Sequence, residues 1–321
     1  MPYKRKLILS VLLAVSGYGI WIVASQVDAV MASAARVGVA TLAIICALSL
    51  LNYLLRFGRW DWYLRVMGHR LTLARNLRIY LAGFALTTTP GKAGEAIRSV
   101  FLKEQQVPYT DSLAALAVER LADLISVALI ATGGIVLFPQ YRWLALLVSL
   151  VTAAMIVTVQ SRGLRGLLHR LIQHTLPNKF KRSADHAISL LDRASDLMGT
   201  QGMLVGVSLG VVAWSAEAYG FWYLVKALGY ELPFLLAAAV YALSMLAGAA
   251  SFMPGGLGGA EVAMGFMLLT LGLSGPDAVS ATLICRIATL WLAVVIGLVA
   301  LSAQSSAASQ TLDAATNVKQ Q

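Results

Sequence analysis

The chain has 321 residues, of which 59% are hydrophobic and only 12% charged, and its mean hydropathy is +0.75. A soluble domain carries roughly 25% charged residues, so this composition excludes an ordinary soluble enzyme or binding domain. The net charge of +10 raises nucleic-acid binding as an alternative. Most of the basic residues, however, lie between apolar runs, where they suit anionic lipid headgroups better. Cys46 and Cys285 lie inside apolar runs and predict neither a disulfide framework nor a metal site.

Six apolar runs predict complete transmembrane helices, because about 20 apolar residues in helical form cross a hydrocarbon core of ~30 Å. These runs are residues 7–27, 37–57, 110–137, 143–159, 203–228 and 276–301. The first follows Lys4, Arg5 and Lys6 and resembles a signal peptide. Its length and the absence of a small-residue cleavage pattern favour an uncleaved span.

Two further apolar segments, 71–103 and 233–273, are each interrupted by proline and glycine. The first contains Thr-Pro-Gly-Lys-Ala-Gly-Glu at 89–95, and the second Met-Pro-Gly-Gly-Leu-Gly-Gly-Ala-Glu at 253–261. Proline removes a backbone donor and glycine ends regular helix, so each segment predicts two half-helices. We interpret both as re-entrant hairpins. The fold class is then an all-α polytopic membrane protein with six full transmembrane helices and two re-entrant broken-helix hairpins.

The distribution of basic residues predicts that both termini are cytoplasmic. In this topology the outer segments contain only Arg36, Arg142 and Lys226, whereas the inner segments include the arginines between Arg56 and Arg78. The inner segment 162–198 has the pattern of a basic amphipathic helix, lying on a membrane surface or packed against the protein's own cytoplasmic ends. Residues 1–302 then form one transmembrane domain, and residues 303–321 a disordered cytoplasmic tail.

The two halves of the chain, about 7–137 and 143–301, form an internal repeat. An offset of 166 residues superimposes Glu95 on Glu261, Asp111 on Asp277 and Arg120 on Arg286, and Pro90 falls near Pro254. Three complete spans separate the hairpins, which places the hairpins on opposite faces of the bilayer. Inverted repeats of this kind are typical of secondary transporters, whose sites lie where broken helices meet. Nine helical residues after each aspartate place both arginines about 13 Å deep.

The charged residues inside these segments are candidates for a lipid-binding site, since each costs about 2.5–3.5 kcal/mol at a helix centre. The candidates are Lys92, Glu95, Arg98, Glu119, Arg120, Asp123, Glu217, Glu261 and Arg286. The hairpin tips, which would direct backbone N–H groups inward after Gly91 and Gly256, add Pro90, Gly91, Gly94, Pro254, Gly255, Gly256 and Gly258.

Structural alternatives stay open for several of these candidates. Glu119 and Asp123 could simply pair with Arg120 and hold helices together. Glu95 and Glu261 could compensate the dipoles of their half-helices rather than balance a substrate amine or the arginines. We favour a ligand-facing role for Arg120 and Arg286, because a guanidinium binds phosphate with two parallel donors.

Signatures of catalysis are missing from the sequence. No HExxH, GxSxG or metal-ligand spacing occurs, and the four histidines lie in predicted inner loops. Gly91-Lys92 is followed by alanine and lacks the opening glycine of a P-loop. We therefore expect no enzymatic activity, no catalytic residues, no cofactor and no metal.

The motifs Thr-Pro-Gly-Lys-Ala-Gly-Glu-Ala-Ile-Arg (89–98), Val-Glu-Arg-Leu-Ala-Asp (118–123) and Pro-Gly-Gly-Leu-Gly-Gly-Ala-Glu (254–261) resemble the lysylphosphatidylglycerol synthase transmembrane, or flippase-like, family. The likeness covers about residues 5–302. It implies a membrane domain that moves aminoacylated phospholipids, or polyprenyl-linked or hopanoid-type lipids, between leaflets. The family motif positions carry over as Pro90, Gly91, Gly94, Glu95, Arg98, Glu119, Arg120, Asp123, Pro254, Gly255, Gly256, Gly258, Glu261 and Arg286.

One departure is that two-domain members continue into a soluble aminoacyl-transfer domain, whereas this sequence ends about twenty residues after the last predicted span. We therefore expect a lipid flippase or transporter of the bacterial inner membrane that does not itself lysylate lipid. Arg98, Arg120, Arg286 and the hairpin tips would hold the phosphate, and Glu95, Glu261 and Glu217 would balance charge.

An intramembrane enzyme that uses Glu119 or Asp123 as a base, and a transporter of small anions, are the alternatives. The expected partners are membrane lipids and, as open alternatives, a separately encoded lipid-modifying enzyme and a second copy of the chain. Nucleic acid is not expected.

Overall fold

The computed structural model describes residues 27–89, 93–136, 142–161 and 192–304, together with residues 163, 166, 167 and 170. Helices account for the regular secondary structure of these residues, as the sequence predicts. The predicted span at 7–27, most of the basic segment 162–198 and the tail from 305 onward lie outside them. So do Pro90, Gly91 and Lys92 of the first predicted tip.

Five long helices occupy the positions of predicted spans. They are α2 (Val27–Val66), α5 (Tyr109–Ile135), α6 (Arg142–Gln160), α9 (Thr200–Ala227) and α12 (Gly275–Arg286), the last continuing through the π-helical turn η4 (Ile287–Trp291) to Gln304. Among the described helices, α2, α9 and the helix from Gly275 to Gln304 are long and apolar enough to cross a membrane, as judged by length and composition. The described part of the chain therefore has the several apolar helices of a helical membrane protein.

The helix α2 extends beyond its predicted end at residue 57. It continues to Val66, and Gly38 interrupts it with a φ of 72°. Arg56 and Arg59, which we predicted to lie in a cytoplasmic segment, are buried in the protein. Their predicted place between two helices is wrong, because a hydropathy pattern ends a span at the first charge, whereas these charges have partners in neighbouring helices.

Both segments predicted to be broken are broken in the structure. The first consists of α3 (Leu73–Gly83), the 3₁₀ turns η1 (Phe84–Leu86) and η2 (Ala93–Ala96), and α4 (Ile97–Lys103). The second consists of α10 (Phe234–Ala250) and α11 (Gly259–Thr270). At 1.5 Å per residue, none of these four helices reaches ~30 Å.

The second half-helix of the second segment starts at Gly259, not directly after Gly256 as predicted. Gly255, Gly256 and Gly258 have φ values of 64°, 69° and 83°. A right-handed helix cannot begin until these positive φ angles end, so the connection after Ala250 is longer than the sequence pattern indicated.

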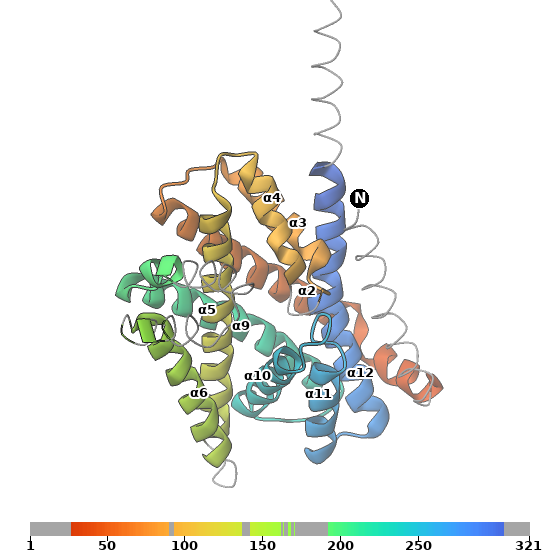
Figure 1. Cartoon of the computed structure of the whole chain (residues 1–321). Coiled ribbons are helices and arrows are strands. Elements are labelled where there is room, and N and C mark those ends of the chain that lie inside the picture. The colour runs from red at the N-terminus through yellow and green to blue at the C-terminus, as the bar shows by residue number, and fades with distance from the viewer. Residues whose placement is uncertain are drawn as a thin grey trace, which may run out of the picture.

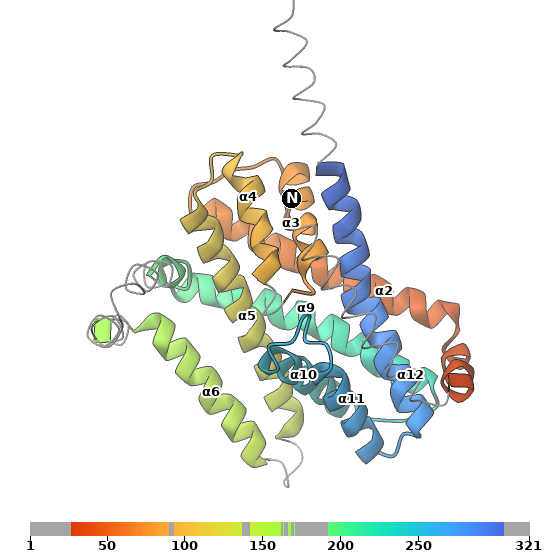
Figure 2. The ribbon, with the colours of Figure 1, turned by 45° about the vertical axis from the view of Figure 1, so that its right-hand side comes forward.

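The helices are arranged so that the two broken segments lie toward opposite ends of the molecule. In Figures 1 and 2, α3 and α4 lie near the first turns of α5, whereas α10 and α11 lie near the first turns of α12. The helices α5 and α12 run in opposite directions, and α2 and α9 cross the middle of the molecule. The two broken segments therefore lie beside the starts of two oppositely directed helices.

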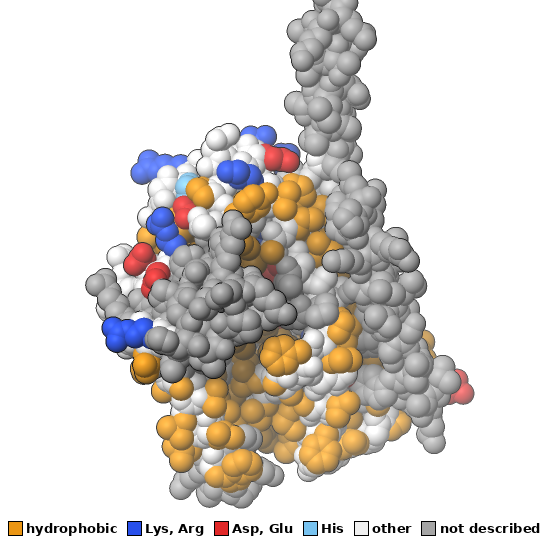
Figure 3. All heavy atoms as spheres, in the orientation of Figure 1, with side chains coloured by type: hydrophobic (Ala, Val, Ile, Leu, Met, Phe, Trp, Pro, Cys, Tyr) orange, Lys and Arg blue, Asp and Glu red, His pale blue; other side chains and the backbone are white. Residues whose placement is uncertain are grey.

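The surface divides into a charged end and an apolar part. On the face drawn in Figure 3, charged side chains gather at the end where α3 and α4 lie, and hydrophobic side chains cover α6, α10 and α11. The exposed basic residues near the charged end include Arg65, Arg70, Arg75, Arg78 and Lys103. An apolar surface of this extent suits contact with lipid.

Close packing of α9 depends on glycines at four-residue spacing, Gly202, Gly206 and Gly210. A Cβ atom on Gly206 would lie 2.3 Å from the hydroxyl oxygen of Tyr63, and one on Gly210 would lie 2.2 Å from Oγ of Ser126. The small residues let α9 approach α2 and α5 closely. Arg59 of α2 can then donate to the carbonyl oxygen of Gly206 at 3.1 Å.

Replacing Gly206 with leucine is expected to destabilise the protein by about 1–3 kcal/mol, because the larger side chain forces α9 away from α2. Thermal unfolding of the purified protein in detergent measures this effect. Gly133→Leu is the matched control, since a Cβ atom on Gly133 meets nothing within 4 Å. Equal unfolding temperatures for the two variants would contradict this account of the packing.

Candidate functional site

The tips of the two broken segments meet inside the molecule. A Cβ atom built on Gly255 would lie 3.4 Å from Cα of Thr88 and 3.4 Å from Cδ2 of Leu290. At the first tip the backbone N–H of Gly94 donates to Oγ1 of Thr89 at 2.6 Å. Tips that start from opposite ends of the molecule are thus in contact beside α12.

Each half forms the same ion pair between its broken segment and its last helix. Arg120 of α5 lies 3.3 Å from Oε2 of Glu95, and Nε of Arg286 in α12 donates to Oε1 of Glu261 at 2.6 Å. These are the residues that the 166-residue offset superimposes. Arg286 also donates to the carbonyl oxygen of Gly255 at 2.8 Å, which ties α12 directly to the second tip. Residues that the offset superimposes therefore form corresponding ion pairs.

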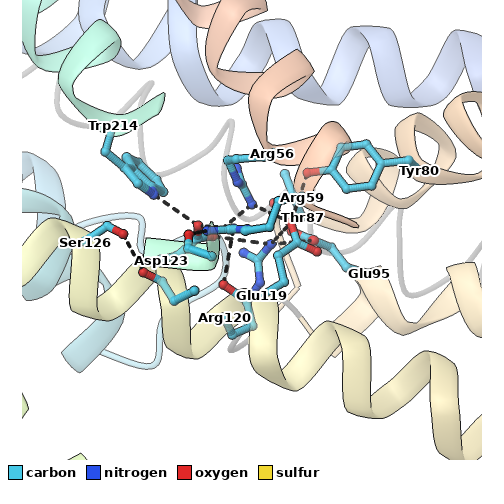
Figure 4. A network of polar contacts seen from close by, with 12 residues as sticks. Arg56, Arg59, Tyr80, Thr87, Glu95, Glu119, Arg120, Asp123, Ser126 and Trp214 are labelled. Carbon is cyan, nitrogen blue, oxygen red and sulfur yellow. Dashed lines mark hydrogen bonds and ion pairs between the residues drawn. The ribbon is translucent and has the colours of Figure 1, made fainter. Parts of the chain in front are cut away.

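The first half surrounds its ion pair with further buried charges, which we call the buried ion network. Its members are Arg56, Arg59, Glu95, Arg98, Glu119, Arg120 and Asp123. Figure 4 labels all of them except Arg98, and it shows the labelled side chains converging from α2, α5 and η2. Apart from Arg120, whose side chain is 23% exposed, these residues are buried.

Glu119 is the centre of the network. Its Oε1 accepts from Tyr80 at 2.9 Å, from Arg120 at 3.0 Å and from Arg56 at 3.2 Å. Its Oε2 accepts from Arg98 at 2.9 Å. One fully enclosed carboxylate thereby joins α2, α3, α4 and α5.

Arg98 is held between this carboxylate and an aromatic wall. Its second terminal nitrogen donates to Glu95 at 2.9 Å, and its guanidinium carbon lies 4.1 Å from the ring centroid of Tyr80. A Cβ atom on Gly83 would lie 2.3 Å from Nε of Arg98, so only glycine admits this side chain. Salt bridges and stacking together fix the plane of the guanidinium group.

Asp123 is the carboxylate that connects the network to α9. It accepts from Arg59 at 2.5 Å and from Nε1 of Trp214 at 3.1 Å, and it lies 3.0 Å from Arg56. Arg120 lies 3.6 Å from it. The predicted pairing of Arg120 with Asp123 is therefore present but is one contact of a larger network (Figure 4).

A central cavity of about 310 Å³ lies between the halves. Charged side chains from both halves line it, and so does an apolar wall from the second broken segment. The charged residues are Arg56, Glu95, Arg120, Asp123, Glu217 and Arg286. The apolar wall includes Met245, Leu246, Ala249, Phe252 and Met253. Thr87, Gly255 and Gly256 bring both tips to the same cavity.

The predicted site residues divide by their position around this cavity. Glu95, Arg120, Asp123, Glu217, Arg286, Gly255 and Gly256 line it. Arg98, Glu119 and Glu261 are buried and contact lining residues. The predicted contact between Arg98 and a phosphate stays a prediction. The side chain of Arg98 is buried behind the residues that line the cavity. Lys92, Pro90 and Gly91 lie outside the described residues.

Several residues of the site were not predicted from the sequence. Arg56 lines the cavity and Arg59 donates to Asp123 behind it, but both were assigned to an inner segment between spans. Their spacing of three, with buried Asn52 and Tyr53 one turn earlier, is a helical signal that could have placed them on one buried face. Trp214 and Tyr241 carried no signal that distinguishes them from membrane-facing aromatic residues.

The helix that carries Arg286 changes its geometry at the cavity. The residues directly after Arg286 form the π-helical turn η4, and Thr289 and Leu290 of this turn line the cavity. The hydroxyl of Tyr53 in α2 donates to the carbonyl oxygen of Thr289. Turns of this kind occur mostly as single bulges inside helices and are frequent at functional sites.

The comparisons with known proteins match the chain to membrane proteins. The family model described as the lysylphosphatidylglycerol synthase TM region matches residues 7–297. A UPF0104 membrane protein of Pyrococcus horikoshii is 22% identical over 266 residues, covering 74% of this chain and 79% of that protein. A UPF0104 membrane protein of Methanothermobacter thermautotrophicus is 25% identical over 257 residues, covering 74% and 76% of the two chains. One from Methanocaldococcus jannaschii is 23% identical over 265 residues, covering 76% and 78%.

Replacing Glu119 with glutamine is expected to lower the free energy of unfolding by about 3–5 kcal/mol, because it leaves buried guanidinium groups without their shared carboxylate. Chemical or thermal unfolding in detergent measures the loss. Glu104→Gln is the control, since it removes the same charge from an exposed position at the end of α4. A Glu119→Gln protein as stable as this control would show that the network does not hold the first half together.

Proposed function

This chain belongs to the family of the lysylphosphatidylglycerol synthase transmembrane region, and we propose that it moves a phosphate-bearing lipid between the leaflets of a membrane. The observation that carries the proposal is the central cavity. It combines guanidinium groups from both halves with an apolar wall. A phospholipid presents the same combination, an anionic headgroup joined to acyl chains.

The arginines suit the headgroup. Arg56, Arg120 and Arg286 line the cavity from α2, α5 and α12. Arginine stays charged at any depth in a membrane and binds phosphate oxygens with parallel donors. Arg120 has the most exposed side chain of the four network arginines, at 23%. It can therefore release one of its carboxylate partners and bind a phosphate oxygen instead.

The apolar wall suits the acyl chains. Phe252 and Met253 line the cavity, and they are also exposed on the outside of the protein, Phe252 to 78%. An apolar surface continuous from the cavity to the exterior would let the chains stay in the bilayer while the headgroup crosses. A transporter of a small soluble anion has no need of such a surface.

The arrangement of the broken segments supports an inverted topology for this transport. The segment α3–α4 lies at the end that carries exposed basic residues, and α10–α11 lies toward the other end. We place the basic end on the cytoplasmic side of a cell membrane by the positive-inside rule. The broken segments would then enter as re-entrant hairpins from opposite faces and meet near mid-depth.

The position of the carboxylates favours transport over lipid chemistry. Glu119, the base that an intramembrane enzyme would use, is enclosed behind the cavity and accepts hydrogen bonds on both oxygens. Asp123 lines the cavity, but Arg59 and Trp214 both donate to its Oδ1, and Arg56 lies 3.0 Å from its Oδ2. We propose binding and transport without a change in the lipid.

Proteoliposomes of phosphatidylcholine that contain fluorescently labelled phosphatidylglycerol test the proposal, since a membrane-impermeant quencher reports the leaflet of the probe. We expect Arg120→Gln with Arg286→Gln to slow movement by about tenfold or more, because charge-assisted hydrogen bonds contribute about 1.5–3 kcal/mol each. Arg78→Gln removes an exposed charge and serves as the control.

Unchanged movement in the folded double variant would overturn the role of these arginines. Mass spectrometry of the probe after incubation in detergent separates the alternatives, because an enzyme changes the mass of the lipid without needing two leaflets. Uptake of inorganic phosphate into the same vesicles, with no movement of the probe, would favour a transporter of small anions.

A further inference from the structure

A carboxyl–phenol pair lies in the wall of the central cavity. Glu217 of α9 and Tyr241 of α10 both line the cavity, and both are buried. The hydroxyl of Tyr241 donates to Oε2 of Glu217. Neither residue has an equivalent in the ion pairs that the repeat duplicates, so the pair is a feature of the second half of the chain.

Every helix packed against this part of α9 directs a charged or titratable group toward the cavity. These groups are Tyr53 and Arg56 of α2, Arg120 and Asp123 of α5, Tyr241 of α10, and Arg286 of α12, and the buried thiol of Cys285 precedes Arg286 behind the wall. The arginines stay cationic throughout the physiological range. Arg59 donates to Asp123 from outside the cavity. Glu217 thus shares a cavity with three arginines and two further carboxylates, and it accepts a hydrogen bond from the hydroxyl of Tyr241.

The phenol that donates to Glu217 can hydrogen-bond to either protonation state of the carboxyl group. A phenol hydroxyl donates to a carboxylate and accepts from a protonated carboxyl group, whereas a guanidinium group only donates. Glu95, Asp123 and Glu261 accept hydrogen bonds from Arg98, Arg59 and Arg286, and protonation of any of them would break a charge-assisted contact. Tyr241 allows Glu217 to gain a proton and remain hydrogen-bonded.

Charge balance links this protonation to the headgroup. The cavity is lined by three arginines, Arg56, Arg120 and Arg286, and by the carboxylates of Glu95, Asp123 and Glu217. An incoming phosphate adds one negative charge, and a proton on Glu217 removes one. Binding the two together leaves the charge of a poorly solvated site unchanged, so each favours the other.

We infer that Glu217 is a proton site and that the chain carries one proton with each anionic lipid headgroup. This inference rests on the proposed function. On the loading side an oxygen of Glu217 takes a proton from water as the headgroup enters. On the other side the headgroup leaves and the same proton returns to water. No bond of the lipid changes, and an anion and a proton cross together without net charge.

The steady-state distribution of an anionic probe between leaflets tests this inference. Full-length protein is placed in phosphatidylcholine vesicles with labelled phosphatidylglycerol, and the membrane potential is held at zero with valinomycin and equal potassium. Movement that is not coupled to protons gives equal amounts of probe in the two leaflets. With one proton per headgroup, a difference of one pH unit is expected to enrich the probe up to about tenfold in the leaflet on the alkaline side.

Variants assign the effect to the carboxyl–phenol pair. Glu217→Gln is expected to return the leaflet ratio to about one, and Glu217→Asp to keep an asymmetry, since it retains the titratable group. Glu231→Gln, which neutralises an exposed carboxylate outside the cavity, is expected to match the wild type. Elution volume and unfolding temperature in detergent show whether each variant is folded.

Two results would overturn the inference, and they can be told apart. If wild-type protein moves the probe but the two leaflets hold equal amounts of it under the pH gradient, proton coupling is wrong and the proposed transport stands. If Glu217→Gln keeps the full asymmetry, the proton site lies elsewhere. A wild-type protein that moves no probe contradicts the proposed function, and the coupling with it.

Discussion

An arginine buried in an apolar membrane protein needs a carboxylate beside it, and the rest of this structure depends on where those carboxylates lie. In each half this carboxylate belongs to a glutamate shortly after the Pro-Gly break, Glu95 or Glu261. Its arginine lies in the helix that follows the whole broken segment, α5 or α12. A charge left alone at a helix centre costs about 2.5–3.5 kcal/mol on insertion scales. Pairing therefore pulls each broken tip against the last helix of its own half, which brings both tips to one place.

The two halves use this shared arrangement differently. The first half surrounds it with a closed network in which Glu119 joins four helices, and the second half places its Arg286–Glu261 pair beside glycines with positive φ angles. Removing one partner from a closed ion network is far more harmful than replacing a solvated charge. We interpret the first half as the rigid side of the cavity. The second half, with its exposed Phe252 and π-helical turn, supplies the side that can adapt to a lipid.

The sequence predicts much of the fold because proline, glycine and charge are rare in apolar segments and their positions carry information. The breaks near Pro90 and Pro254, the repeat and the convergence of Arg120 and Arg286 all follow from such positions. The network partners Arg56 and Arg59 did not follow, because hydropathy treats a buried, paired arginine as the end of a span. The start of α11 at Gly259 also escaped prediction, since composition alone does not give the φ angles of Gly255, Gly256 and Gly258.

The most direct test of the convergence is a disulfide between the two tips. Cys46 and Cys285 are first replaced by alanine, and Thr88→Cys is combined with Gly255→Cys. A Cβ atom on Gly255 would lie 3.4 Å from Cα of Thr88, so the two backbones approach closely enough for cysteines at these positions to meet. We predict that mild oxidation in membranes cross-links this pair and leaves the control pair, Thr88→Cys with Gly272→Cys, unlinked. If the folded Thr88→Cys, Gly255→Cys protein keeps both thiols reduced, or if each thiol reacts separately with a maleimide, the two tips do not meet as described.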